Sequence, residues 1–96
     1  MTGSEWDPRK NDRNRRKHGV TFESASTVFE DPWALVAFDS GEASEDRWIL
    51  IGRATDRDAL VVAFAVREHE SADVIRIISA RHALRHERTR YEQQAH

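Results

Sequence analysis

The sequence predicts an α+β fold with two N-terminal helices, a four-stranded antiparallel sheet and a C-terminal helix. Three observations predict it: helical periodicity at both ends of the chain, four short apolar segments in the middle, and short polar connections between those segments. The 96 residues, 39% of them hydrophobic, suit one compact domain over residues 1–96. In such a domain we expect the helices to cover one face of the sheet.

The first helix is predicted from about Pro8 to His18. Asp7 can accept the unpaired N–H groups of the first turn, and proline suits the first helical position. Gly19 can end the helix because glycine readily adopts a left-handed conformation. Thr21 is the predicted cap of a second, short helix over residues 22–30, whose apolar side chains recur at helical spacing.

The middle of the chain predicts strands, because short segments rich in β-branched and aromatic residues follow one another at residues 35–38, 48–51, 59–66 and 74–78. Their connections, at residues 39–44, 56–58 and 68–73, are short and polar. Short connections favour hairpins and therefore an antiparallel sheet. From Arg81 to about Gln94 no helix breaker occurs. Residues such as Ala83, Leu84, Glu87, Arg88 and Tyr91 recur at steps of three and four, which predicts the last helix.

Charge is strongly segregated along the chain, although the net charge is only −2. Residues 9–17 carry six Lys and Arg against one acid, residues 19–46 carry seven acids and no Lys or Arg, and the C-terminal stretch is basic again. If folding joins the basic segments, they form a phosphate-binding face, and the acidic segment then faces a basic partner or solvent. The alternative is that the basic segments are simply solvated helix faces.

Several functional classes are excluded or disfavoured. The chain has no cysteine, so disulfides, thiol catalysis and thiolate metal sites are absent. No apolar run is long enough for a transmembrane helix, and the N-terminus lacks an apolar signal region, so we expect no membrane association and a cytoplasmic location. His82 and His86 could hold a metal if both lie on one helix, but a solvated helix face is the simpler interpretation. We therefore predict neither a metal nor a cofactor.

An ordered series of motifs from about residue 5 to residue 92 resembles the BrnT family of toxins. The motifs are Trp6-Asp7-Pro8, Asn14, the segment 17–22 (Lys-His-Gly-Val-Thr-Phe), the segment 28–32 (Val-Phe-Glu-Asp-Pro), Glu45, Arg47, Ile51-Gly52, the segment 60–62 (Leu-Val-Val), the segment 75–81 (Ile-Arg-Ile-Ile-Ser-Ala-Arg), Ala83, Glu87, Arg88 and Tyr91. The resemblance implies a RelE-like fold and a metal-independent endoribonuclease that cleaves mRNA and blocks translation. It also implies a BrnA-type antitoxin that neutralises the toxin in a heterotetramer and contacts operator DNA through its own domain.

Cleaving RNA without a metal requires a base for the 2′-hydroxyl, cations for the charge on the phosphorane, and an acid for the leaving oxygen. Arg67 and Arg81 end the third and fourth predicted strands, and the resemblance implies that arginines at such positions support toxicity. Their convergence is a hypothesis. His18 is the motif residue suited to proton transfer near neutral pH. The alternatives are a helix-start charge for Arg81, pairing with acids for Arg67, and a helix cap for His18.

A second group of residues is predicted to bind RNA: Lys17, Arg53, Arg76, Glu87, Arg88 and Tyr91. The last three equally suit packing between helix and sheet or internal ion pairs, and packing is the favoured interpretation for Tyr91. The acidic net charge and the lack of an unambiguous general base support a rival function. In that alternative the chain is a non-catalytic nucleic-acid or antitoxin-binding module, including a degenerate toxin that acts only in operon repression.

Overall fold

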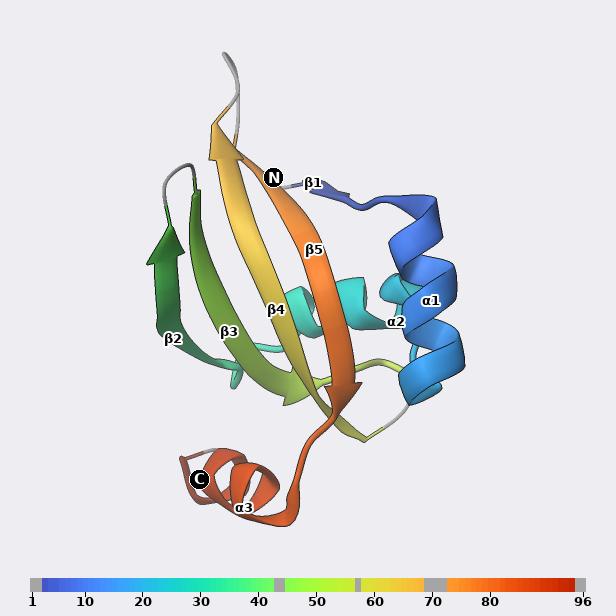
Figure 1. Cartoon of the computed structure of the whole chain (residues 1–96). Coiled ribbons are helices and arrows are strands. Elements are labelled where there is room, and N and C mark those ends of the chain that lie inside the picture. Colours follow the sequence, from blue (N-terminus) through green and yellow to red (C-terminus); the bar gives the residue numbers. More distant parts are fainter. Residues whose placement is uncertain (1–2, 43–44, 57, 69–72, 95–96) are drawn as a thin grey trace.

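The computed structural model describes residues 3–42, 45–56, 58–68 and 73–94 of the chain. Its elements, in chain order, are β1 (Gly3–Glu5), α1 (Pro8–His18), α2 (Phe22–Ser26), the 3-10 helix η1 (Thr27–Glu30), β2 (Leu35–Glu42), β3 (Glu45–Arg53), β4 (Ala59–Glu68), β5 (Asp73–His82) and α3 (Arg85–Gln94). The α+β class is therefore confirmed, with strands that are longer than predicted. Figure 1 shows one twisted sheet with α2 behind it, α1 along one side and α3 at one end.

The first helix begins and ends where the sequence predicts, and the second begins at its predicted cap. Asp7 accepts the N–H of Arg9 at 2.9 Å at the start of α1, and Gly19 ends the helix with a φ of 71°. Thr21 caps α2 by accepting the N–H of Ser24 at 3.1 Å. The predicted helix over residues 22–30 is wrong in one detail, because it tightens into η1 after Ser26.

The sheet has five strands in the order β1-β5-β4-β3-β2, so the prediction of a four-stranded antiparallel sheet is wrong. The strands from β2 to β5 form the expected antiparallel meander. The additional strand, β1, pairs in parallel with β5 through Gly3↔Val74 to Glu5↔Arg76. Three residues without an apolar pattern give no strand signal of their own, and only the neighbouring edge of β5 makes them a strand.

The main core lies between the sheet and the helical segment that precedes it. It contains Val20, Phe22, Ala25 and Val28 from that segment and Leu50, Leu60, Val62, Phe64, Ile77 and Ala80 from the strands. We call this side of the sheet the helix face. Gly52 allows the close approach of η1, because a Cβ at Gly52 would lie 2.8 Å from Cγ1 of Val28.

The prediction that all helices cover one face is wrong. A second apolar cluster, formed by Ala59, Val61 and Ala83 with Ile49 and Ile51, lies on the opposite side of the sheet, and α3 contacts β3. The predicted start of the last helix at Arg81 is also wrong, since β5 continues to His82 and α3 begins at Arg85. β5 extends this far because its backbone pairs with that of β4 up to His82, which lies opposite Leu60.

Part of each predicted connection lies outside the described residues: 43–44, 57 and 69–72, which include His69. His96, at the C-terminus, also lies outside the described residues. Within the described parts, β2 extends to Glu42, inside the predicted 39–44 connection, and β3 begins at Glu45, before the predicted start at residue 48. None of the helices in these parts has the length and apolar character needed to cross a bilayer.

Candidate nucleic-acid interface

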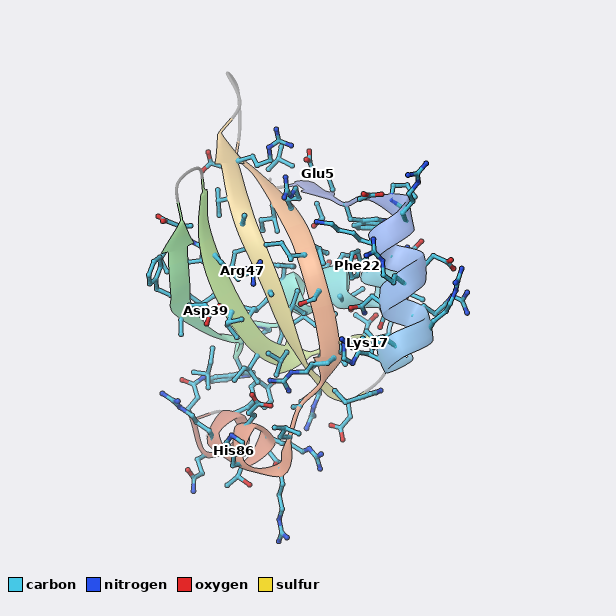
Figure 2. The ribbon with its side chains drawn as sticks, viewed as in Figure 1. Glu5, Lys17, Phe22, Asp39, Arg47 and His86 are labelled. Carbon is cyan, nitrogen blue, oxygen red and sulfur yellow. The ribbon has the colours of Figure 1, made fainter. Side chains whose placement is uncertain are left out.

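Five arginines project from the side of the sheet opposite the helix face. The register pairs Arg47 with Ala65 and Ala65 with Arg76, while Arg53 lies opposite Ala59 and Arg81 opposite Val61. Side chains of paired residues share a face, and alternate residues of one strand share a face, so these arginines lie on the same side as Arg67. We call this side, with Arg47, Arg53, Arg67, Arg76 and Arg81, the arginine face. Figure 2 shows Arg47 on the side turned toward the viewer.

The centre of the arginine face is a row of three residues on three neighbouring strands. Ala65 of β4 lies between Arg47 of β3 and Arg76 of β5, and it is fully buried. Beside this small methyl side chain Arg47 is exposed and Arg76 is half-buried. Arg47 and Arg76 thus lie on the two strands that flank β4, on one face of the sheet, where guanidinium groups can contact phosphates.

Arg67 and Arg81 do not converge. Arg67 ends β4, whereas Arg81 lies opposite Val61 near the start of β4. The span from residue 61 to residue 67 corresponds to about 20 Å of strand. Antiparallel pairing places the C-terminal ends of neighbouring strands at opposite ends of the sheet, so these two arginines cannot contact the same phosphate. Arg67 instead donates to Glu5 at 3.1 Å, and its side chain stays 48% exposed.

Arg81 is held by Glu87 of α3 in a two-point ion pair. The two N–H···O distances are 2.8 and 2.9 Å. Glu87 also accepts the backbone N–H of Leu84 at 2.8 Å, which caps the first turn of α3. The hydrogen bonds from Arg81 lower the pKa of Glu87 to about 2, against the opposing effect of burial, and the same pair raises the pKa of Arg81. Glu87 is therefore ionised and a weak base.

A second network joins the C-terminal part of α3 to the rest of the fold. Tyr91 is buried and donates to Asp31 at 2.5 Å, while Asp31 also accepts the backbone N–H groups of Arg53 and Trp33. Burial would raise the pKa of Asp31, but these hydrogen bonds outweigh it and lower that pKa. Burial and then the bond to Asp31 raise the pKa of Tyr91 to about 12. Tyr91 is thus a poor proton donor and fixes α3 in place.

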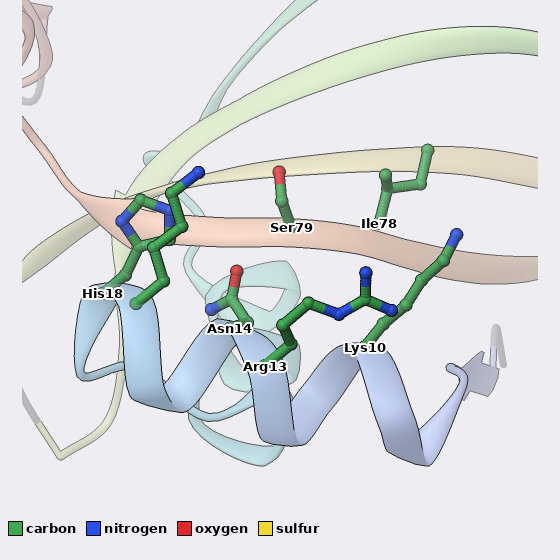
Figure 3. Close-up of a pocket in the computed structure, with 7 residues that line it drawn as sticks. Lys10, Arg13, Asn14, His18, Ile78 and Ser79 are labelled. Carbon is green, nitrogen blue, oxygen red and sulfur yellow. The ribbon is translucent and has the colours of Figure 1, made fainter.

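A basic groove runs between α1 and β5. Its volume is about 260 Å³, and it is lined by Lys10, Arg13, Asn14, Lys17, His18, Ile78 and Ser79. Figure 3 shows this groove. The five α1 residues occupy positions three and four apart, so they form one stripe of the helix. Arg15 and Arg16 are not in this stripe and pair with Asp12. We call this groove the α1 groove.

The α1 groove and the arginine face meet across β5. The register shifts between Ala63↔Ser79 and Phe64↔Ile77, so Ile78 is an extra residue in β5. Such a bulge re-aims neighbouring side chains, which is why both Ile78 and Ser79 reach the groove. Ser79 is exposed and lies opposite Ala63, on the side of the arginine face. Lys17 and His18 in the groove are therefore continuous with the arginines through Ser79.

The remaining predicted residues lie near α3. Arg88 donates to the carbonyl of Ala83 at 3.4 Å, and its Nε is buried without a hydrogen-bond partner among the described residues. His82 belongs to β5 and His86 to α3, so the two histidines are not one turn apart on a helix. Within the described parts of the chain, no group of three potential metal ligands occurs.

Sequence reasoning missed Arg47, Lys10, Arg13 and Ser79 as site residues. Arg47 carried a usable signal, because Arg47, Ile49, Ile51 and Arg53 alternate along one strand and must share a face. Lys10 and Arg13 share helical spacing with Lys17. The position of Ser79 had no such signal, since it depends on the bulge in β5.

Comparison with known proteins agrees with this architecture. A family model described as "Ribonuclease toxin, BrnT, of type II toxin-antitoxin system" matches residues 6–87. The chain belongs to the BrnT family. A search of curated proteins found no match. A solved structure, the 1.1 Å crystal structure of the Brucella abortus ribonuclease toxin BrnT, aligns with a TM-score of 0.62 and 22% sequence identity. The alignment covers 88% of this chain and 100% of that one, so the BrnT fold is shared.

Membership confirms the family resemblance found in the motifs. It places the chain among ribonuclease toxins of type II systems, which implies an antitoxin as partner.

Proposed function

We propose that this BrnT-family chain is a metal-independent endoribonuclease that binds single-stranded mRNA across the arginine face and the α1 groove. The observation that carries the proposal is the gathering of five arginines from three neighbouring strands on one sheet face, continuous with a basic helix stripe. The sheet face supplies cations to a chain of phosphates, and arginine keeps its charge throughout a reaction.

The reaction is an attack of the 2′-oxygen on the adjacent phosphorus. The P–O5′ bond breaks, leaving a 2′,3′-cyclic phosphate and a 5′-hydroxyl, while a base takes the proton from the 2′-hydroxyl and an acid protonates the leaving oxygen. Glu87 and Tyr91 are poorly suited to proton transfer, because the pKa of Glu87 is about 2 and that of Tyr91 about 12. His18, which lines the α1 groove, is our candidate for the residue that transfers protons in this reaction.

Arg81 is our candidate for stabilising the phosphorane. Asn14 bonds to Ala80, the neighbour of Arg81, and His18 follows Asn14 by one helical turn. Arg81 and His18 thus flank the same stretch of β5, whereas Arg67 lies about 20 Å along the sheet. Arg67 is accordingly assigned to RNA binding, together with Arg47, Arg53, Arg76 and Lys17.

The first test is cleavage of a labelled single-stranded RNA in EDTA. His18→Ala should lower kcat by about 10²–10⁴-fold. Arg47→Ala should raise KM by about tenfold and leave kcat nearly unchanged, because it removes a phosphate contact only. Arg9→Ala is the matched control: Arg9 is an exposed residue of α1 outside both surfaces, and its loss changes the net charge equally. Circular dichroism verifies folding.

Two results would contradict the proposal. Wild-type protein that leaves RNA intact, with and without ribosomes, would exclude an active ribonuclease. Equal losses in Arg9→Ala and Arg47→Ala would show that only total charge matters.

One observation favours a second candidate function, a non-catalytic RNA-binding module. Arg81 and Tyr91 both have strong internal partners, as structural residues do. Such a module would bind the RNA with the same dependence on Arg47 but would not cleave it.

The proposal includes neutralisation by a BrnA-type antitoxin, which contacts operator DNA through its own domain and forms a heterotetramer with the toxin. Family membership supports this part. The mass of the purified complex, measured by light scattering, should correspond to two copies of each chain.

A further inference from the structure

An exposed apolar surface lies on the helix face, on the part of the sheet that α2 and η1 leave uncovered. Val36 is 56% exposed, Phe38 53% and Val66 43%. The register places Val36 opposite the core residue Leu50 and Phe38 opposite Trp48, and Val66 follows Phe64 by two residues. These side chains therefore share the helix face. We call Val36, Phe38, Trp48 and Val66 the β2 shelf.

The β2 shelf is contiguous and preformed. The rings of Phe38 and Trp48 meet edge to face with centroids 5.3 Å apart. Single exposed apolar residues are ordinary on a protein surface, but neighbouring ones that include two aromatic rings are typical of the buried centre of an interface.

The shelf borders an open edge of the sheet. β2 is the terminal strand and pairs only with β3 among the described strands. Proteins usually protect such an edge with charged residues, Pro or bulges, and the regularly paired part of β2 before its irregularity, residues 35–38, contains none of these. An extended partner segment could therefore find backbone donors and acceptors beside the apolar side chains.

The charge around the shelf is negative. Asp46 is exposed and precedes Trp48 by two residues in β3, so the two side chains share a face of the sheet. Asp39, which follows Phe38 at the irregularity in β2, is also exposed. The nearest arginine in the sequence, Arg47, projects from the arginine face instead. This surface therefore disfavours RNA and anionic lipid headgroups. A second copy of the chain would bring its own acids against these acids.

We propose that the β2 shelf is a docking surface for a basic, amphipathic segment of the antitoxin. Apolar side chains of that segment cover Phe38 and Val36, and its Lys or Arg side chains pair with Asp46 and Asp39. The inference rests on the proposed antitoxin partner but not on RNA cleavage. It places this contact on the opposite side of the sheet from the arginine face, so toxin variants can lose antitoxin binding and keep their RNA chemistry.

The test is titration calorimetry of the full-length toxin with its purified cognate antitoxin. Phe38→Lys and Asp46→Lys should each raise Kd at least about tenfold, since each adds a positive charge at the centre or rim of the surface. Leu84→Lys and Glu92→Lys are the matched controls, an exposed apolar residue and an exposed acid near α3, and should change Kd by less than about twofold. Circular dichroism checks that each variant folds.

Unchanged Kd values for both shelf variants would overturn the inference, and so would the absence of binding by the wild type. A wild-type dimer that Phe38→Lys dissociates, seen by sedimentation velocity, would instead assign the shelf to self-association. RNA cleavage measured on the same samples separates the two proposals. If the wild type binds antitoxin through the shelf but cleaves no RNA, only the proposed ribonuclease activity fails.

Discussion

At the scale of single residues, Asn14 uses both ends of its amide on the backbone of other elements. Its Nδ2 donates to the carbonyls of Val20 and Ala80, each at 2.8 Å, and its Oδ1 accepts the N–H of Ala80 at 3.1 Å. Beyond Arg76, β5 no longer pairs with β1, and Asn14 satisfies the polar groups that this edge exposes. One buried side chain thus positions the α1 groove against β5.

Replacing Asn14 should therefore cost more than an ordinary polar substitution. Asn14→Ala leaves buried backbone groups without partners, and we expect the free energy of unfolding to fall by about 2–4 kcal/mol. Urea denaturation at pH 7 measures this change, with Arg9→Ala as a control expected to stay within about 0.5 kcal/mol. A loss no greater than that of the control would show that water replaces the amide at this edge.

At the scale of elements, α3 is fixed at both ends by side chains from elsewhere. Glu87 holds its first turn to Arg81, and Tyr91 holds its last part to Asp31. Few apolar residues of α3 are buried, Tyr91 being the one described as such. Polar contacts therefore provide much of the energy that holds α3 to the fold. The free energy of unfolding should then depend on pH.

The sign of that dependence follows from Glu87. Its pKa falls from 4.5 to about 2 on folding, so the stabilisation is fully present above about pH 4.5 and is lost as the pH falls toward 2. The shift corresponds to at most about 3–4 kcal/mol, and because Arg81 is 39% exposed, solvent screening reduces it to on the order of 1–2 kcal/mol. Glu87→Gln should lose this amount at pH 7.

Denaturation of wild type and Glu87→Gln at several pH values between 7 and 2.5 checks this expectation. The difference between the two should shrink steadily below pH 4.5. Glu92→Gln, an exposed residue of the same helix, serves as the control and should follow the wild type throughout. A constant difference over the whole range would mean that packing of α3, not the charge of Glu87, is responsible.

At the scale of the whole molecule, charge is sorted between surfaces although the net charge is −2. The arginine face and the α1 groove are basic, and the β2 shelf is bordered by acids. The protein as a whole does not attract RNA, so binding must depend on local contacts with phosphates. Local cationic contacts release counterions, which makes the affinity fall with salt.

Fluorescence anisotropy with a labelled, non-cleavable 2′-O-methyl RNA measures this salt dependence. Each phosphate contact on a single strand contributes about 0.7 to the slope of log K against log salt concentration. Arg47→Ala and Lys17→Ala should each reduce the slope by about that amount, and Arg9→Ala should leave it unchanged. If all three variants reduce it equally, the RNA is not bound at the proposed surface.

The sequence by itself determined what local chemistry controls. The caps at Asp7, Gly19 and Thr21 are confirmed because each acts within a few residues of its own position. The apolar segments of β2 to β5 are confirmed as an antiparallel meander because short connections permit little else. Membership of the BrnT family, inferred from an ordered series of motifs, is confirmed over residues 6–87.

Only the tertiary structure decided how distant segments meet. The pairing of β1 with β5, the side of the sheet that α3 occupies, and the bulge at Ile78 depend on contacts between residues far apart in the chain. Alternation along a strand could place Arg47 and Arg53 on one face, but the register alone puts Arg76 beside them and separates Arg67 from Arg81. Strand register is fixed by packing of the whole core, so no local pattern contains it.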